Sequence, residues 1–161
     1  MANRGNLGGL ADSTPRVVAL LDGIGFDDVI VETVGVGQAE VVVAASADTV
    51  VVVVSPGWGD SVQAAKAGLL EIGDVFVVNK ADRPGAHEAV TDLNRMLDVG
   101  PEWVWRPPVV TTVAIDGTGL GELLTAIADH RRHLVETDSL GELRRDRALR
   151  EIEAAMRSGL R

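Results

Sequence analysis

The sequence predicts an α/β fold with three layers, in which helices cover both faces of a parallel sheet. Residues 49–54 are a threonine followed by five valines. A continuous β-branched run without alternation is typical of a strand that is buried on both faces. Further apolar runs at residues 74–78 and 109–113 are separated by helical patterns. Strands that alternate with helices favour parallel pairing, which gives the predicted architecture.

The composition excludes several classes of protein. The 161 residues suffice for one domain with a substantial core, and because 46% of them are hydrophobic we expect an ordered chain. There is no cysteine, so disulfides and thiolate metal sites are excluded. A net charge of −9 without a basic stripe argues against nucleic acid. No apolar run is long enough to span a bilayer and no signal peptide is recognised, so we expect a cytoplasmic protein without membrane contact.

The first third of the chain is predicted to hold a loop, a helix, a short strand and a turn. Thr14 and Pro15 are typical of an N-cap and a first helical residue, and Gly23 is typical of a helix end. The predicted elements are a glycine-rich loop at residues 1–11, a helix at 14–23, a strand at 28–33 and a short helix or turn at 41–45.

The rest of the chain alternates between helices and strands. Asp60 is a good N-cap and Gly73 a good helix end, while Ser139 and Glu142 form a capping-box pattern. The last helix has an apolar stripe made of Leu143, Ala148, Ile152, Ala155 and Met156. The predicted elements are a helix at residues 60–72, a strand at 74–78, a helix at 86–98, a strand at 109–113, a helix at 120–134 and a helix from 139 onward.

The most informative motif is Asn79-Lys80-Ala81-Asp82, which directly follows the apolar run at residues 75–78. Ligands of open α/β sheets bind at the carboxyl ends of the strands, where this motif lies. The Asp82 carboxylate can accept hydrogen bonds from N1–H and the exocyclic amine of guanine, whereas adenine has no donor at N1. Asn79 can address the opposite edge of the base, and the methylene stem of Lys80 can cover the ring. The motif therefore predicts a guanine site.

A second motif that would be expected with this one is absent. No G-x-x-x-x-G-K-[ST] phosphate-binding loop occurs in the 161 residues. The sequence thus has the pattern of the base-binding half of a guanine-nucleotide site without its phosphate-binding half.

Two further strand ends carry candidate site residues. Glu32 could hold Mg²⁺ through water, and Gly35 would let its backbone approach a γ-phosphate. On these residues alone, an edge carboxylate followed by a turn glycine is the favoured interpretation. Ala114 follows the strand at 109–113 and could donate its backbone N–H to the guanine O6 atom.

Some conspicuous side chains are interpreted as structural. His130 and His133 lie one turn apart, and a solvated helix face is favoured over a metal site. Trp103 and Trp105 alternate beside prolines, so we expect them to pack a loop rather than stack on a ligand. No serine, histidine and aspartate arrangement suggests nucleophilic catalysis.

Taken together, five segments resemble the MeaB/ArgK family of P-loop GTPases, which chaperone methylmalonyl-CoA mutase. The string Glu32-Thr33-Val34-Gly35-Val36-Gly37-Gln38 is far more specific than the guanine motif. The segments that carry the resemblance are residues 7–11, 32–38, 56–60, 63–68 and 79–82.

The resemblance implies a P-loop GTPase fold, GTP or GDP with Mg²⁺ as cofactors, and a cobalamin-dependent mutase as partner. By resemblance, Glu32 is the carboxylate near magnesium, and Gly35 and Gln38 belong to the segment that senses the γ-phosphate. Members of the family guard adenosylcobalamin loading and the exchange of damaged cofactor.

Residues 56–66 resemble the third switch of the family, which signals the nucleotide state to the mutase. This resemblance makes Asp60, Gln63 and Lys66 candidates for partner coupling rather than for base binding. We expect residues 1–136 to be a partial GTPase domain and residues 137–161 to begin a dimerisation arm, so a homodimer is possible.

The sequence also departs from the family pattern. The first strands and the phosphate-binding loop are not present in it, so we expect an incomplete fold and negligible GTPase activity. The family's first strand lies between the strands ending at Glu32 and Ser55, so the valine strand would be an aggregation hazard without it. Two hypotheses stay open: part of a MeaB-like GTPase, or a catalytically inactive module that binds the mutase without nucleotide. A receiver-like signalling domain is disfavoured.

Overall fold

The computed structural model describes residues 14–33, 46–57, 70–100 and 102–159. The chain divides into two compact units, residues 1–47 and residues 48–161, which we describe separately. The loop and turn predicted at residues 1–11 and 41–45 lie outside the described residues. So does most of the helix predicted at 60–72, of which residues 70–72 are described and are helical.

In the first unit, helix α1 (Thr14–Gly23) begins and ends where the sequence predicts. Gly25 follows it with a φ of 93°, and its N–H donates to the Asp22 carbonyl. The strand predicted at residues 28–33 is wrong, because these residues have no regular secondary structure and Ile30 is 92% exposed. A strand is held by a paired neighbour, and no described residue pairs with this run.

The second unit is built on a parallel sheet of three strands, β1 (Val51–Val54), β2 (Val75–Asn79) and β3 (Val109–Thr112). The strands lie in the order β1-β2-β3, and both pairs are parallel. The register places Val54 beside Val78 and Asn79 beside Thr112, so the carboxyl ends of the strands lie at one edge. The predicted parallel pairing is confirmed.

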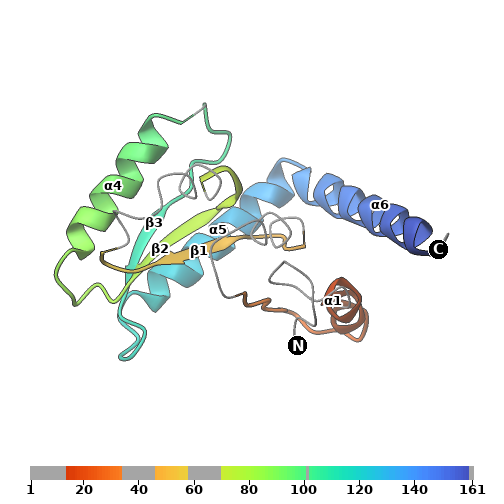
Figure 1. The fold of residues 1–161 in the computed structure, drawn as a ribbon, viewed down its shortest axis with the longest axis horizontal. Coiled ribbons are helices and arrows are strands. Elements are labelled where there is room, and N and C mark those ends of the chain that lie inside the picture. Colours follow the sequence, from red (N-terminus) through yellow and green to blue (C-terminus); the bar gives the residue numbers. More distant parts are fainter. Residues whose placement is uncertain (1–13, 34–45, 58–69, 101, 160–161) are drawn as a thin grey trace. The chain divides into compact units, whose positions relative to one another are not determined.

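Helices α4 (Ala86–Asp98) and α5 (Leu120–Glu136) cover opposite faces of this sheet (Figure 1). Alternate residues of β2 explain the arrangement, because successive side chains point to opposite faces. Phe76 and Val78 pack in a cluster with the α4 residues Leu93 and Leu97, while Val75 and Val77 pack with Ala126 of α5. The predicted three layers are confirmed.

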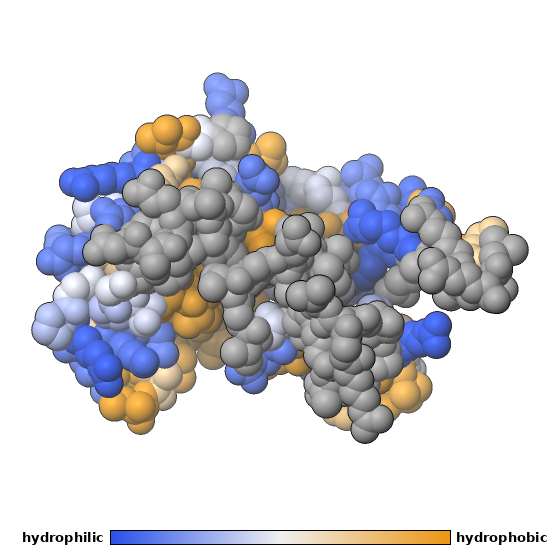
Figure 2. Space-filling model, viewed as in Figure 1, coloured by the Kyte–Doolittle hydropathy of each residue, from blue (hydrophilic) through white to orange (hydrophobic). Residues whose placement is uncertain are grey.

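Strand β1 is less enclosed than its sequence suggests. Val52 and Val54 are buried, but Val53 is 61% exposed, so the prediction that this strand is buried on both faces holds only in part. The reason is position: β1 is an outer strand of the described sheet. Apolar patches lie among hydrophilic side chains on the visible face (Figure 2).

The chain ends in helix α6 (Ser139–Gly159), which begins at the predicted residue. It follows α5 after a tight turn in which Asp138 has a φ of 57°. Leu149, Ile152 and Met156 project from α6 and are each more than half exposed. None of the described helices has the length and apolarity needed to cross a membrane.

Candidate functional site

The carboxyl edge of the sheet brings together loops that are far apart in sequence. The loop after β2 begins at Lys80, and the loop after β3 begins at Val113. A Cβ atom built on Gly85 would lie 3.6 Å from the Pro56 Cβ atom, so the loops after β1 and β2 also approach each other here. This edge is where the guanine motif was expected to act.

Asn79 is fixed by the end of β3. Its Oδ1 atom accepts a hydrogen bond of 3.2 Å from the Thr112 hydroxyl and one of 3.1 Å from the Ala114 N–H. Because a backbone N–H can only donate, these contacts identify the oxygen of the amide. The amide NH₂ group remains as a donor, which suits an acceptor on the major-groove edge of a purine.

Lys80 has a backbone conformation that is uncommon for a residue with a side chain. Its φ is 58°, in the left-handed region, and such conformations in non-glycine residues cluster at functional sites. The turn is secured on both sides: the Ala81 N–H donates to the Thr112 carbonyl, and the Arg83 N–H donates to the Lys80 carbonyl, each at 3.0 Å. The loop is therefore preorganised against β3.

Asp82 is exposed, and no ion pair or hydrogen bond to its carboxylate occurs within the described parts of the chain. The residue stands three positions after Asn79 in the secured turn. Both carboxylate oxygens are thus available to accept hydrogen bonds, as recognition of a guanine edge requires.

Ala114 lies in a turn that its own neighbours stabilise. The Val113 N–H donates to the Thr118 carbonyl, and the Thr118 N–H donates to the Asp116 carboxylate at 2.9 Å. Hydrogen bonds from the Thr118 backbone and hydroxyl lower the pKa of Asp116. The Ala114 N–H already donates to Asn79, so any ligand acceptor at this N–H would have to share or replace that bond.

Gly119 closes this turn and starts α5. Its φ is 79°, and a Cβ atom on it would overlap the Thr111 carbonyl oxygen and lie 3.2 Å from the Thr112 Cα atom. Only glycine fits this approach of the helix start to the end of β3.

The remaining predicted residues lie either in the first unit or outside the described residues. Glu32 is exposed and belongs to the first unit. The described residues hold no group of three or more metal-ligating side chains. Five predicted site residues lie outside the described part of the chain: Gly35, Gln38, Asp60, Gln63 and Lys66.

The structure corrects one interpretation and confirms another. His130 does not lie on a solvated helix face; it is 3% exposed and contacts Thr49 and Asp74. Trp103 and Trp105 pack loops, as predicted, because their ring N–H groups donate to the carbonyls of Leu97 and Asp74.

Sequence reasoning placed the segment Thr112-Val113-Ala114 at the site but missed the role of the Thr112 side chain, which is 3% exposed and orients Asn79. The available signal was its position: it is the last residue of a strand that parallel pairing places beside the strand ending in Asn79.

Comparison with known proteins identifies the family of this chain. A family model described as methylmalonyl Co-A mutase-associated GTPase MeaB matches residues 1–161. A Pyrococcus horikoshii protein that is provisionally named as a GTPase is 48% identical over 157 residues, covering 95% of this chain and 50% of its own length. GTPase ArgK of Escherichia coli is 34% identical, over 90% of this chain and 45% of its own length.

A mouse protein named methylmalonic aciduria type A homolog, mitochondrial, is 33% identical over 87% of this chain and 35% of its own length. The crystal structure of a LAO/AO transport system kinase superposes with a TM-score of 0.76 and 27% identity, over 91% of this chain and 48% of that chain. This chain thus spans half or less of the length of these relatives. Because the family model matches all 161 residues, the chain belongs to the MeaB family of GTPases.

Proposed function

We propose that this chain supplies the base-binding half of a guanine-nucleotide site in a MeaB-type GTPase. The observation that carries the proposal is the secured turn after β2, which holds Asn79 against β3 and leaves the Asp82 carboxylate exposed. In this proposal Asp82 accepts hydrogen bonds from N1–H and the exocyclic amine of guanine. Asn79 donates to the opposite edge, the Lys80 stem covers the ring, and the Ala114 N–H meets O6.

We further propose that the bound species is GTP or GDP with Mg²⁺. The donors and acceptors around Asn79 and Asp82 fit guanine. The assignment of Glu32 to magnesium, and of Gly35 and Gln38 to sensing of the γ-phosphate, rests on the resemblance of residues 32–38 to the family string.

The partner that we propose is methylmalonyl-CoA mutase or a related cobalamin-dependent mutase, which the protein would chaperone. The description of the matching family and the name of the mouse relative support this partner. Asp60, Gln63 and Lys66 would couple nucleotide state to the mutase. Residues 1–136 would form the partial GTPase domain.

Residues 137–161 would begin a homodimerisation arm, for which the exposed apolar side chains of α6 offer support. We place the protein in the cytoplasm, without contact to nucleic acid or membrane.

A titration with a fluorescent GDP analogue tests the base site. We expect saturable binding that unlabelled GDP reverses and ADP does not, because Asp82 finds a donor at N1 only in guanine. Binding of a purified mutase without any detectable GDP binding would instead favour the inactive interaction module. The lack of a phosphate-binding loop in the 161 residues is the observation in favour of that alternative.

Phosphate release from GTP tests the other half of the site. We expect the 161-residue chain to turn over GTP at the rate of a protein-free control with Mg²⁺, because phosphoryl transfer depends on a phosphate-binding loop and its lysine. An intact family member is the positive control. Turnover comparable to that control would contradict the prediction.

A further inference from the structure

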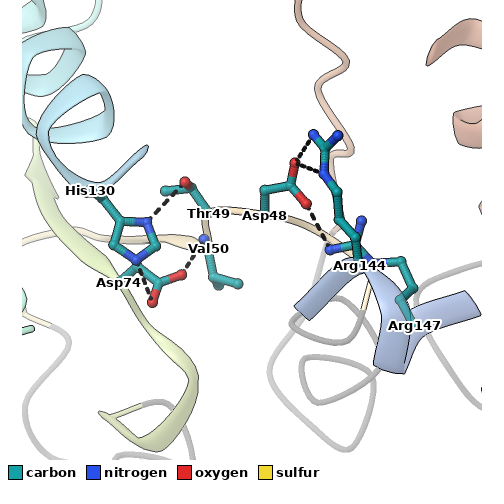
Figure 3. A network of polar contacts seen from close by, with 7 residues as sticks. All are labelled: Asp48, Thr49, Val50, Asp74, His130, Arg144 and Arg147. Carbon is teal, nitrogen blue, oxygen red and sulfur yellow. Dashed lines mark hydrogen bonds and ion pairs between the residues drawn. The ribbon is translucent and has the colours of Figure 1, made fainter. Parts of the chain in front are cut away.

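A network of polar contacts lies at the amino ends of the strands, the opposite edge from the guanine motif (Figure 3). Its centre is the pair of consecutive residues Asp48 and Thr49, which Val50 separates from the start of β1. Asp48 contacts helix α6, and Thr49 contacts helix α5. We call Asp48, Thr49, Asp74, His130, Arg144 and Arg147 the strand-root cluster.

His130 is the buried member of the strand-root cluster. Its Nδ1 atom lies 3.0 Å from the Thr49 hydroxyl, and its Nε2 atom lies 3.4 Å from a carboxylate oxygen of Asp74. The other carboxylate oxygen of Asp74 accepts the Val50 N–H at 2.8 Å. Because an ionised Asp74 can only accept, we assign the proton of the neutral ring to Nε2, the nitrogen beside Asp74, so that Nδ1 accepts from the Thr49 hydroxyl.

Trp105 covers this group. Its ring centroid lies 5.0 Å from that of His130 and 5.3 Å from that of His133, and its N–H donates to the Asp74 carbonyl at 2.8 Å. The titratable groups that face His130 are therefore Asp74, from the loop before β2, and His133, from its own helix.

Asp48 ties the same backbone segment to α6. One carboxylate oxygen lies 2.6 Å from Arg144 and the other lies 3.0 Å from Arg147. Burial alone would raise the pKa of Asp48, but the hydrogen bonds and charges of the two arginines outweigh it and lower the pKa. The Asp48 carboxylate therefore stays ionised at pH values at which His130 changes its charge, so a change in this contact in that pH range does not arise from titration of Asp48 itself.

We propose that the strand-root cluster is a proton-linked latch. In its closed state Thr49 contacts His130 and Asp48 contacts helix α6. Protonation of His130 breaks the Thr49 contact, which loosens the backbone before β1 and thereby weakens the contact of the adjacent Asp48 with α6. Protonation turns Nδ1 from an acceptor into a donor, so the Thr49 hydroxyl loses the partner to which it donates. It also places a positive charge on a ring that is 3% exposed.

The sign of the pH effect follows from the pKa directions. Burial lowers the pKa of His130 from its ordinary 6.5, and the Asp74 charge offsets this only in part. The closed latch is thus fully favoured above pH 6.5, and its stability falls as the pH drops below that value. Burial raises the pKa of Asp74, although the hydrogen bond from the Val50 N–H and the His130 charge act to lower it. Protonation of Asp74 at lower pH therefore favours the closed latch, which is opposite to the effect of protonating His130.

Nuclear magnetic resonance of the 161-residue chain tests the latch, because its three histidines can be assigned individually. The reporters are the Val50 amide, which donates to Asp74, and the Arg144 Nε–H, which donates to Asp48 at 3.2 Å. We expect the hydrogen-exchange protection of both groups to fall together as His130 titrates. The fall is up to about tenfold for each unit that separates the His130 pKa in the closed and open states.

Matched variants separate this latch from general acid destabilisation. His130→Gln should abolish this pH-dependent step in hydrogen-exchange protection. His133→Gln, on the same helix beside the same tryptophan, should keep the step. Asp48→Asn should keep the step at Val50 and remove it from the α6 reporter. Protection that is constant while His130 titrates in the unmodified chain, or an unchanged step in His130→Gln, would overturn the proposal even if another variant failed to fold.

Discussion

Replacing Asp82 with alanine is expected to lower the affinity for GDP by about 10²–10⁴-fold. The carboxylate is exposed, and it is expected to accept two hydrogen bonds from the base. Hydrogen bonds to charged groups contribute about 1.5–3 kcal/mol each, so losing both costs about 3–6 kcal/mol. The measurement is competition between GDP and a fluorescent GDP analogue.

Asp82→Asn tests the same site through a change in base specificity rather than through a loss of affinity. Asparagine presents one acceptor and one donor, which matches the N1–H and the 2-oxo group of xanthine rather than the two donors of guanine. We expect this variant to prefer XDP over GDP. Asp92→Asn, at a half-exposed carboxylate on α4, is the matched control and should bind GDP unchanged. Equal GDP affinity in Asp82→Ala and the unmodified chain would show that position 82 does not select the base.

Gly119→Ala is expected to destabilise the fold more than any other single methyl addition considered for this loop. The new Cβ atom would overlap the Thr111 carbonyl oxygen, and the φ of 79° disfavours a side chain. Strain of this kind costs about 1–3 kcal/mol and overpacking costs a similar amount, so we expect a loss of about 2–5 kcal/mol. Thermal unfolding should show a melting temperature roughly 5–15 °C lower.

Gly121→Ala is the control for this substitution. It lies two residues later in α5, where a Cβ atom would meet nothing within 4 Å. Alanine in a helix is favoured over glycine by about 0.5–1 kcal/mol, so this variant should melt slightly higher. If Gly119→Ala had the same melting temperature as the unmodified chain, the turn would relax around the new methyl group without a loss of stability. If GDP binding weakened in Gly119→Ala but not in Gly121→Ala, the turn that Gly119 closes would be linked to the proposed contact of Ala114 with the base.

The sequence was most informative where local pattern and burial agree. The valine-rich strands, their parallel pairing and the position of Asn79 at the end of β2 follow from continuous apolar runs that alternate with helices. It misled at residues 28–33, where β-branched residues lack a described partner strand. Propensity describes how a residue suits a pleated surface, and pairing supplies the surface.

The sequence by itself determined the layered fold, the family resemblance and the presence of the Asn79-Lys80-Ala81-Asp82 motif at the end of a strand, because each is read from patterns of residues that are close along the chain. Only the tertiary structure decided the burial of His130, the orientation of Asn79 by Thr112 and the exposure of Val53. Thr49 and His130 are 81 positions apart, and Asn79 and Thr112 are 33 apart. Their contacts depend on sheet order and helix placement, which local periodicity does not encode.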